Sequence, residues 1–151
     1  MDVQPTSRNR RILVADDDEM LASTLALIFS RAGFECRMAL SGEEAVETAK
    51  KFKPDVFLTD YTMGTMNGME AAAAVHQYAP RCRIIVFSGE AVIPDEHKYR
   101  SAGLDFAVLV KPQPLEEILR MACGNPARFP VVKGLPCKKV RRVGRHARRM
   151  A

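Results

Sequence analysis

Short apolar runs alternate with amphipathic segments along most of the chain, and this alternation restricts the fold more than any other feature. Each apolar run is too short for an ordinary helix and is bounded by turn or polar residues, which predicts a strand. The predicted strands cover residues 12–15, 34–39, 54–60, 83–87 and 106–110. The segments between and after them have helical spacing, and the predicted helices cover residues 18–31, 41–51, 69–80, 94–101 and 114–122.

The inner predicted strands are apolar throughout rather than alternately apolar and polar. Strands of this kind are buried on both faces, as in parallel sheets whose crossover helices cover both sides. The predicted fold class is therefore α/β, a doubly wound five-stranded parallel sheet with helices on both faces. For such a sheet we expect the strand order 2-1-3-4-5.

The last part of the chain differs in charge from the rest. Residues 1–123 hold 14 Lys+Arg and 18 Asp+Glu, whereas residues 124–151 hold nine Lys+Arg and no acid. We predict a flexible N-terminus over 1–10, one domain over 11–123 and a basic, disordered tail over 124–151. Glycine, proline and the lack of interleaved aromatic residues favour a solubilising role for the tail over binding of nucleic acid or an acidic membrane.

The cysteines and the apolar runs indicate the compartment. The four cysteines have wide spacings and no C-x-x-C pair, which predicts neither a zinc site nor a disulfide framework. The N-terminal residues contain no apolar stretch, and no run approaches the roughly 18 residues that a membrane span requires. We expect a soluble, unsecreted, cytoplasmic protein.

Polar side chains stand at the ends of several predicted strands. Asp16 and Asp17 follow the first strand, and Asp60 ends the third. Ser88 and Lys111 follow the fourth and fifth. Ligands of doubly wound sheets bind beyond the carboxyl ends of the strands, where strands 1 and 3 are neighbours in the expected order. We expect these five side chains to face one crevice.

Carboxylates that lie close together repel one another, so they bind protons or share a cation. Oxygen ligands select a hard ion, and Mg²⁺ suits them because it accepts one or two carboxylates and pairs with a substrate phosphate. A phosphoryl group can then be transferred to an aspartate, with the metal and a lysine neutralising its oxygens. We assign Asp60 as this nucleophile.

From about residue 10 to residue 122, the sequence resembles the receiver domain of bacterial two-component response regulators, in particular the stand-alone type of the chemotaxis regulators. The resemblance rests on the acidic pair after residues 12–15, the strand 54–60, and the segments 86–89 and 110–112. It implies a flavodoxin-like fold. It also implies a phosphoacceptor signalling domain in a phosphorelay, with only self-phosphorylation and slow self-dephosphorylation as chemistry.

The resemblance also implies roles for single residues. Asp60 resembles the phosphoacceptor, and Ser88 and Lys111 resemble the residues that contact the phosphoryl group and take part in the switch. The implied Mg²⁺ ligands are Asp16, Asp17, Asp60 and the backbone carbonyl of Thr62. The implied donor is a histidine kinase or phosphotransfer protein. An output protein or a second copy of the chain would bind the face formed by the fourth helix, fifth strand and fifth helix.

Two positions depart from the family pattern. Gly64 follows Met63 where the family commonly has proline. Val108 stands where an aromatic switch residue is usual, and Phe106 lies two residues earlier. Val108 and Phe106 are the candidate switch positions, and the output mechanism stays open.

Two other functions stay open at this point. A phosphatase of the haloacid-dehalogenase type uses a D-x-D pattern after its first strand, which Asp16 and Asp18 match formally. Rapid multiple turnover of a phosphate ester would identify it. A degenerate receiver-fold module with a nucleic-acid-binding tail is the other. Salt-sensitive DNA binding that survives Asp60→Asn and vanishes on deletion of residues 124–151 would favour it.

Overall fold

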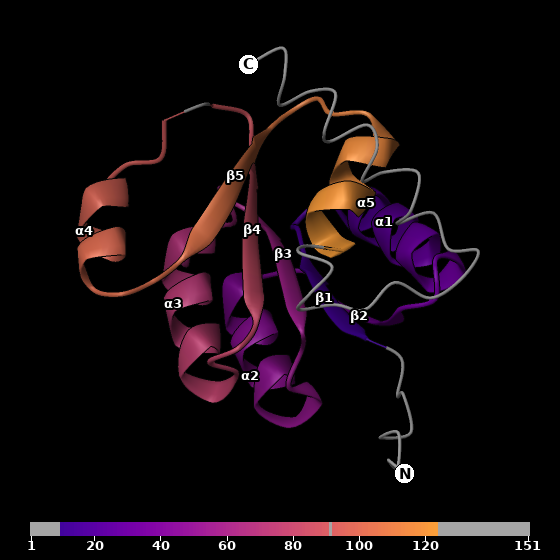
Figure 1. Ribbon diagram of the computed structural model, residues 1–151, viewed down its shortest axis with the longest axis horizontal. Helices are drawn as coiled ribbons and strands as arrows, with labels where there is room; N and C mark the ends of the chain where they lie inside the picture. Colours follow the sequence, from indigo (N-terminus) through magenta and orange to yellow (C-terminus); the bar gives the residue numbers. More distant parts are fainter. Residues whose placement is uncertain (1–9, 91, 124–151) are drawn as a thin grey trace, which may run out of the picture.

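Five parallel strands form the centre of the computed structural model, which describes residues 10–90 and 92–123 (Figure 1). The strands are β1 (Arg11–Ala15), β2 (Glu35–Ala39), β3 (Val56–Asp60), β4 (Arg83–Ser88) and β5 (Phe106–Val110). The helices are α1 (Glu19–Arg31), α2 (Gly42–Phe52), α3 (Gly68–Tyr78), α4 (Glu96–Ser101) and α5 (Leu115–Cys123). The predictions for 1–10 and 124–151 fall outside the described residues, Arg10 excepted.

The strand order is β2-β1-β3-β4-β5, and every pairing is parallel, which confirms the predicted order and fold class. Asp60 pairs with Phe87, and Ser88 pairs with Val110. The carboxyl ends of the strands therefore meet along one side of the sheet, called the carboxyl edge below. The opposite side, where the strands begin, is called the amino edge.

Both faces of the sheet are covered, as the apolar strands predicted. Figure 1 shows α1 and α5 on one side of the sheet and α2, α3 and α4 on the other. Leu58 belongs to the core cluster beneath α1 and α5, and its neighbour Phe57 belongs to the cluster on the opposite face. Both side chains are almost completely buried. No helix within the described residues is long and apolar enough to cross a membrane.

The observed element boundaries agree with the predicted ones to within two residues. The largest difference at a helix start is at α4, which begins at Glu96 rather than at Pro94. Asp95 has φ 60, in the left-handed region, and its side chain caps no backbone N–H. A left-handed residue cannot continue a right-handed helix, so the helical residues begin after it.

The cysteines of the described residues have no catalytic features. Cys36 and Cys82 are free thiols, and burial raises the pKa of Cys36 to about 11, which disfavours the reactive thiolate. Cys123 is disulfide-bonded. The prediction of no disulfide framework rested on sequence spacing, and spacing does not report which thiols approach in space.

Candidate phosphoacceptor and metal site

Asp60 ends a strand whose other residues are all buried. Residues Val56 to Thr59 are fully buried, and the Asp60 side chain is 13% exposed at the carboxyl edge. Its carboxylate has a cation beside it, because the Lys111 Nζ lies 3.1 Å from its Oδ1. The strand thus presents one carboxylate, paired with one lysine, at the mouth of the site.

The turn from β1 to α1 holds three consecutive acids in different environments. The Asp16 carboxylate is buried and accepts the backbone N–H of Asp18 at 2.9 Å. Asp18 is the N-cap of α1, and its side chain accepts the backbone N–H groups of Met20 and Leu21. Asp18 therefore caps the start of α1. The D-x-D pattern of the phosphatase alternative places its second acid at this helix start.

Asp16, Asp17 and Asp60 come together, as the order of the strands predicted. One carboxylate oxygen from each residue lies within 4.8 Å of the others. Burial raises the pKa of Asp16 and the charge of Asp60 raises it further, against the effects of the Asp18 backbone and Lys111. The single positive charge of Lys111 does not balance the negative charges of three carboxylates. This donor set, made only of oxygen, fits a hard divalent cation such as Mg²⁺.

Lys111 connects the fifth strand to this cluster. Its Nζ is 3.1 Å from Asp60 and 3.7 Å from Asp16, and it lies 5.1 Å from the ring centroid of Phe87. The Lys111 backbone N–H donates to the Ser88 carbonyl at 2.7 Å, which continues the pairing of β4 with β5. Lys111 is thus held by the sheet and directed at two carboxylates.

Ser88 and Thr62 line a pocket of about 320 Å³ beside the acids, and the three carboxylates are not among its lining residues. Ser88 is buried, and its Oγ accepts the backbone N–H of Glu90 at 3.0 Å. Thr62 is exposed in the loop after β3. In that loop Gly64 has φ 60, which the ring of proline cannot reach. Position 64 could therefore not hold a proline in this conformation.

The two candidate switch residues occupy different places in β5. Val108 is half-buried and pairs with Val86, two residues before Ser88. Phe106 pairs with Ile84, further from the carboxyl edge, and is buried in the core. The guanidinium of Arg100 covers its ring at 3.9 Å. Phe106 is thus a core residue in this conformation, and Val108 is the nearer of the two to the site.

Sequence reasoning missed the role of Gly68 at this site. A Cβ on Gly68 would lie 2.2 Å from the Asp60 carbonyl oxygen, and the Gly68 N–H donates to the Tyr61 carbonyl at 2.6 Å. The first residue of α3 therefore packs directly on the backbone of the acceptor strand. A glycine at a helix start was the available signal, but it does not reveal which backbone lies opposite.

Replacement of Asp16 by asparagine is expected to raise the free energy of unfolding in metal-free buffer at neutral pH. The raised pKa means that Asp16 favours folding when protonated, and this contribution is lost as the pH rises through the raised pKa. Asparagine keeps an acceptor for the Asp18 N–H and removes the charge, so we expect a gain of about 1 kcal/mol. Urea unfolding with a chelator measures it, and the gain should disappear in acid. A variant less stable than the native chain at neutral pH would contradict this.

Comparison with known proteins identifies the family. The family model of the response regulator receiver domain matches residues 12–122. The chain is 39% identical over 80 residues to the chemotaxis protein CheY of Thermotoga maritima, covering 52% of this chain and 67% of CheY. It is 31% identical over 109 residues to the transcriptional regulatory protein PrrA of Mycobacterium tuberculosis, covering 72% of this chain but only 46% of PrrA.

Solved structures agree with the sequence relatives. A response regulator protein from Burkholderia pseudomallei superposes with a TM-score of 0.68 at 29% identity, covering 93% of this chain and 86% of that one. Its crystal structure holds a phosphorylated aspartic acid, a calcium ion and citrate. The fold, the strand order and the family match all agree, and the chain belongs to the response regulator receiver domain family.

Proposed function

We propose that the chain is a signalling switch that accepts a phosphoryl group on Asp60 in a Mg²⁺-dependent reaction. The observation that carries this proposal is the cluster of Asp16, Asp17 and Asp60 with Lys111 in contact with two of them. The phosphorylated aspartic acid and calcium ion of the Burkholderia relative support it. The donor is a histidine kinase or phosphotransfer protein.

Each residue has a role that follows from its position. An Asp60 carboxylate oxygen forms a bond to phosphorus while the bond between phosphorus and the donor breaks, and the donor leaves with the electron pair. Lys111 is already within ion-pair distance of Asp60 and neutralises an oxygen of the transferred group. Asp16 and Asp17, with the Thr62 carbonyl, hold Mg²⁺, which supplies positive charge to the phosphoryl oxygens when bound.

Ser88 links the site to the rest of the fold. Its Oγ accepts an N–H from Glu90 in the loop after β4, and its own hydroxyl proton can be donated to a phosphoryl oxygen at the same time. A ligand shifts a conformational equilibrium only through contacts that differ between the two states. We propose that this new hydrogen bond moves Ser88 and the attached loop between β4 and α4, with Val108 rather than an aromatic residue at the switch position.

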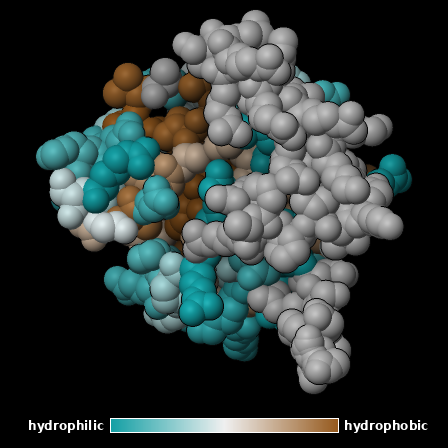
Figure 2. Space-filling model, viewed as in Figure 1, coloured by the Kyte–Doolittle hydropathy of each residue, from teal (hydrophilic) through white to brown (hydrophobic). Residues whose placement is uncertain are grey.

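The output surface in this proposal is the face formed by α4, β5 and α5. Figure 2 shows apolar side chains gathered between α4 and β5 on the face viewed. Val92, in the segment between β4 and α4, is 75% exposed, and Ala107 and Val108 of β5 are half-buried. An exposed apolar strip beside a switch loop fits a protein partner or a second copy of this chain. Its occupancy would then depend on phosphorylation.

Labelling with a small phosphodonor tests the proposed function. Incubation of the native chain with acetyl phosphate and Mg²⁺ should add one hydroxylamine-labile phosphoryl group, which peptide mapping should locate at Asp60. A chelator should reduce the labelling rate at least about a hundredfold, because the clustered carboxylates then repel the anionic donor. Labelling that ignores the chelator, or that maps to another residue, would contradict the proposed chemistry.

A further inference from the structure

The amino edge of the sheet, opposite the phosphoacceptor site, carries a cluster of cations. We call this cluster the basic edge, and it consists of Arg11, Arg37, Lys50, Lys51 and Lys53. Arg11 and Arg37 come from neighbouring strands, and the lysines come from the last turn of α2 and the residue after it. Nothing in the proposed phosphoryl chemistry uses these residues.

Four of these cations lie over two aromatic rings. Arg11 and Arg37 lie 5.5 and 5.0 Å from the centroid of the Phe52 ring. Lys50 and Lys53 lie 5.4 and 6.0 Å from the centroid of the Tyr78 ring. Phe52 is buried, whereas Tyr78 is 37% exposed. The basic edge therefore presents cations around one accessible aromatic surface.

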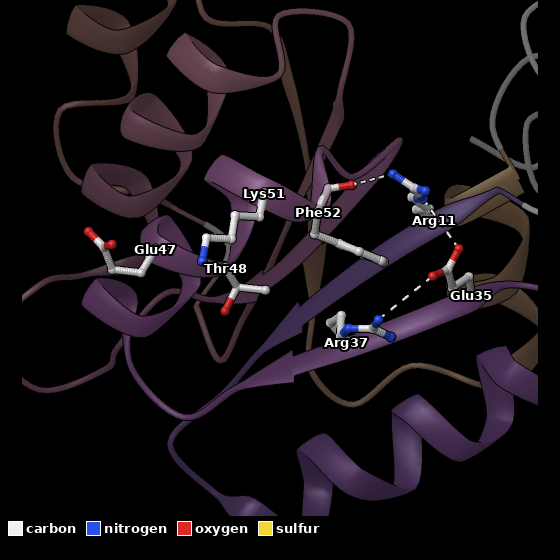
Figure 3. Close-up of a pocket in the computed structure, with 7 residues that line it drawn as sticks. All are labelled: Arg11, Glu35, Arg37, Glu47, Thr48, Lys51 and Phe52. Carbon is white, nitrogen blue, oxygen red and sulfur yellow. Dashed lines mark hydrogen bonds and ion pairs between the residues drawn. The ribbon is translucent and has the colours of Figure 1, made fainter.

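Two pockets lie at this edge, and each has a volume of about 340 Å³. Figure 3 shows the first, in which Arg11 and Arg37 both approach Glu35 and the Lys51 side chain comes from α2. The second is lined by Lys53, Tyr78 and Arg81 among others. Lys53 donates to the Tyr78 carbonyl at 3.1 Å, so a lysine and the ring stand at the same opening.

The cations of the basic edge are only partly neutralised. Glu35 lies 3.2 Å from Arg11 and 3.8 Å from Arg37, so one acid serves two arginines. Glu47 pairs with Lys50 at 2.7 Å. Within residues 10–90 and 92–123, no ion pair joins Lys51 or Lys53 to a carboxylate. The surface therefore has positive charge available to an external anion.

The chain continues from this same edge into its most basic part. Arg10 Nη1 donates to the Cys123 carbonyl at 3.3 Å, and Arg83 Nε donates to the Met121 carbonyl at 2.7 Å. These contacts hold the end of α5 at the starts of β1 and β4. Residues 124–151, with nine Lys+Arg and no acid, follow directly. The end of α5 thus lies at the amino edge of the sheet.

We propose that the basic edge binds the phosphate backbone of a nucleic acid. Partly unpaired lysines contact phosphates without reading sequence. Tyr78 supplies an exposed aromatic surface on which a base can stack. An acidic membrane fits less well, because the large exposed aliphatic side chains of the described residues, Met20, Leu27, Val92 and Leu115, lie in other elements.

The test is a salt titration of binding by the full chain to a fluorescent mixed-sequence DNA duplex and to its single strand. The matched variants are Lys51→Glu, on the basic edge, and Lys98→Glu, on an exposed position of α4. Both change the net charge equally. Lys51→Glu should weaken binding several-fold and reduce the salt slope by about one. Lys98→Glu should leave affinity and slope close to those of the native chain.

The outcomes separate this proposal from its rivals and from the proposed function. Equal weakening by both variants, or no salt-dependent binding at all, would overturn the proposal. Binding to anionic vesicles without binding to nucleic acid would also overturn it. Weaker binding to the single strand by Tyr78→Ala would support stacking on the ring. Asp60→Asn should bind like the native chain, because Asp60 lies at the other edge of the sheet.

Discussion

Replacement of Asp60 by asparagine is expected to abolish phosphoryl labelling while the chain stays folded. Asparagine has the same shape, and its amide oxygen can accept the Lys111 ammonium that now lies 3.1 Å from the carboxylate. It has no nucleophilic carboxylate oxygen, so the labelling rate should fall at least about a hundredfold. The measurement is the mass of intact protein after incubation with acetyl phosphate and Mg²⁺.

The matched control for this variant is Asp105→Asn. Asp105 is exposed just before β5, so its replacement makes the same change in charge far from the cluster. It should label at the native rate. An acid-stable, hydroxylamine-labile phosphoryl group on Asp60→Asn, to the native extent, would show that another residue is the nucleophile. Circular dichroism of both variants checks that a loss of labelling is not a loss of folding.

The parts of the molecule that the sequence predicted depend on periodicity and on the ends of strands. Continuous apolar runs such as the one around Phe57 and Leu58 are buried on both faces in the structure, as expected for a parallel sheet. Once the strands are parallel and their order is known, the residue that ends each strand must lie at one edge. The gathering of Asp16, Asp17 and Asp60 follows from this rule alone.

The parts that the sequence did not predict depend on approaches between distant residues. The Thr65 hydroxyl donates to Glu43 at 2.7 Å and ties the loop after β3 to the start of α2, but neither residue stands in a motif. Whether Phe106 or Val108 lies nearer Ser88 depends on the register of β5 against β4. Strand periodicity predicts on which face of the sheet a side chain lies, but it does not predict the register between two strands.

The two edges of the sheet carry opposite charge, and this separates the two proposals. The three clustered carboxylates lie at the carboxyl edge, and the cluster of Lys51, Lys53 and their neighbours lies at the amino edge. A polyanion at the basic edge would be kept from the acidic cluster by repulsion as well as by distance. Phosphorylation and nucleic-acid binding can therefore be altered independently by substitution.

Replacement of Gly68 by alanine is expected to be the most destabilising single methyl addition near the site. The new Cβ would lie 2.2 Å from the Asp60 carbonyl oxygen and 3.0 Å from the Tyr61 Cα. These are backbone atoms of the acceptor strand and of the residue after it, so no side chain can rotate away to make room. We expect the free energy of unfolding to fall by about 3 kcal/mol, the upper end for an overpacked site.

Gly89→Ala is the matched control for Gly68→Ala, because a Cβ on Gly89 has no heavy atom within 4 Å. Its free energy of unfolding should stay within about 0.5 kcal/mol of the native value. Urea unfolding of both variants measures the difference, and equal midpoints would contradict the close packing of α3 on β3.

Relief of the overlap in Gly68→Ala must move α3 away from the strand or move the Asp60 backbone. Because Lys111 is held by its own pairing to Ser88, a moved Asp60 would lose alignment with it. Gly68→Ala should therefore label more slowly than the native chain even in buffer where it is fully folded.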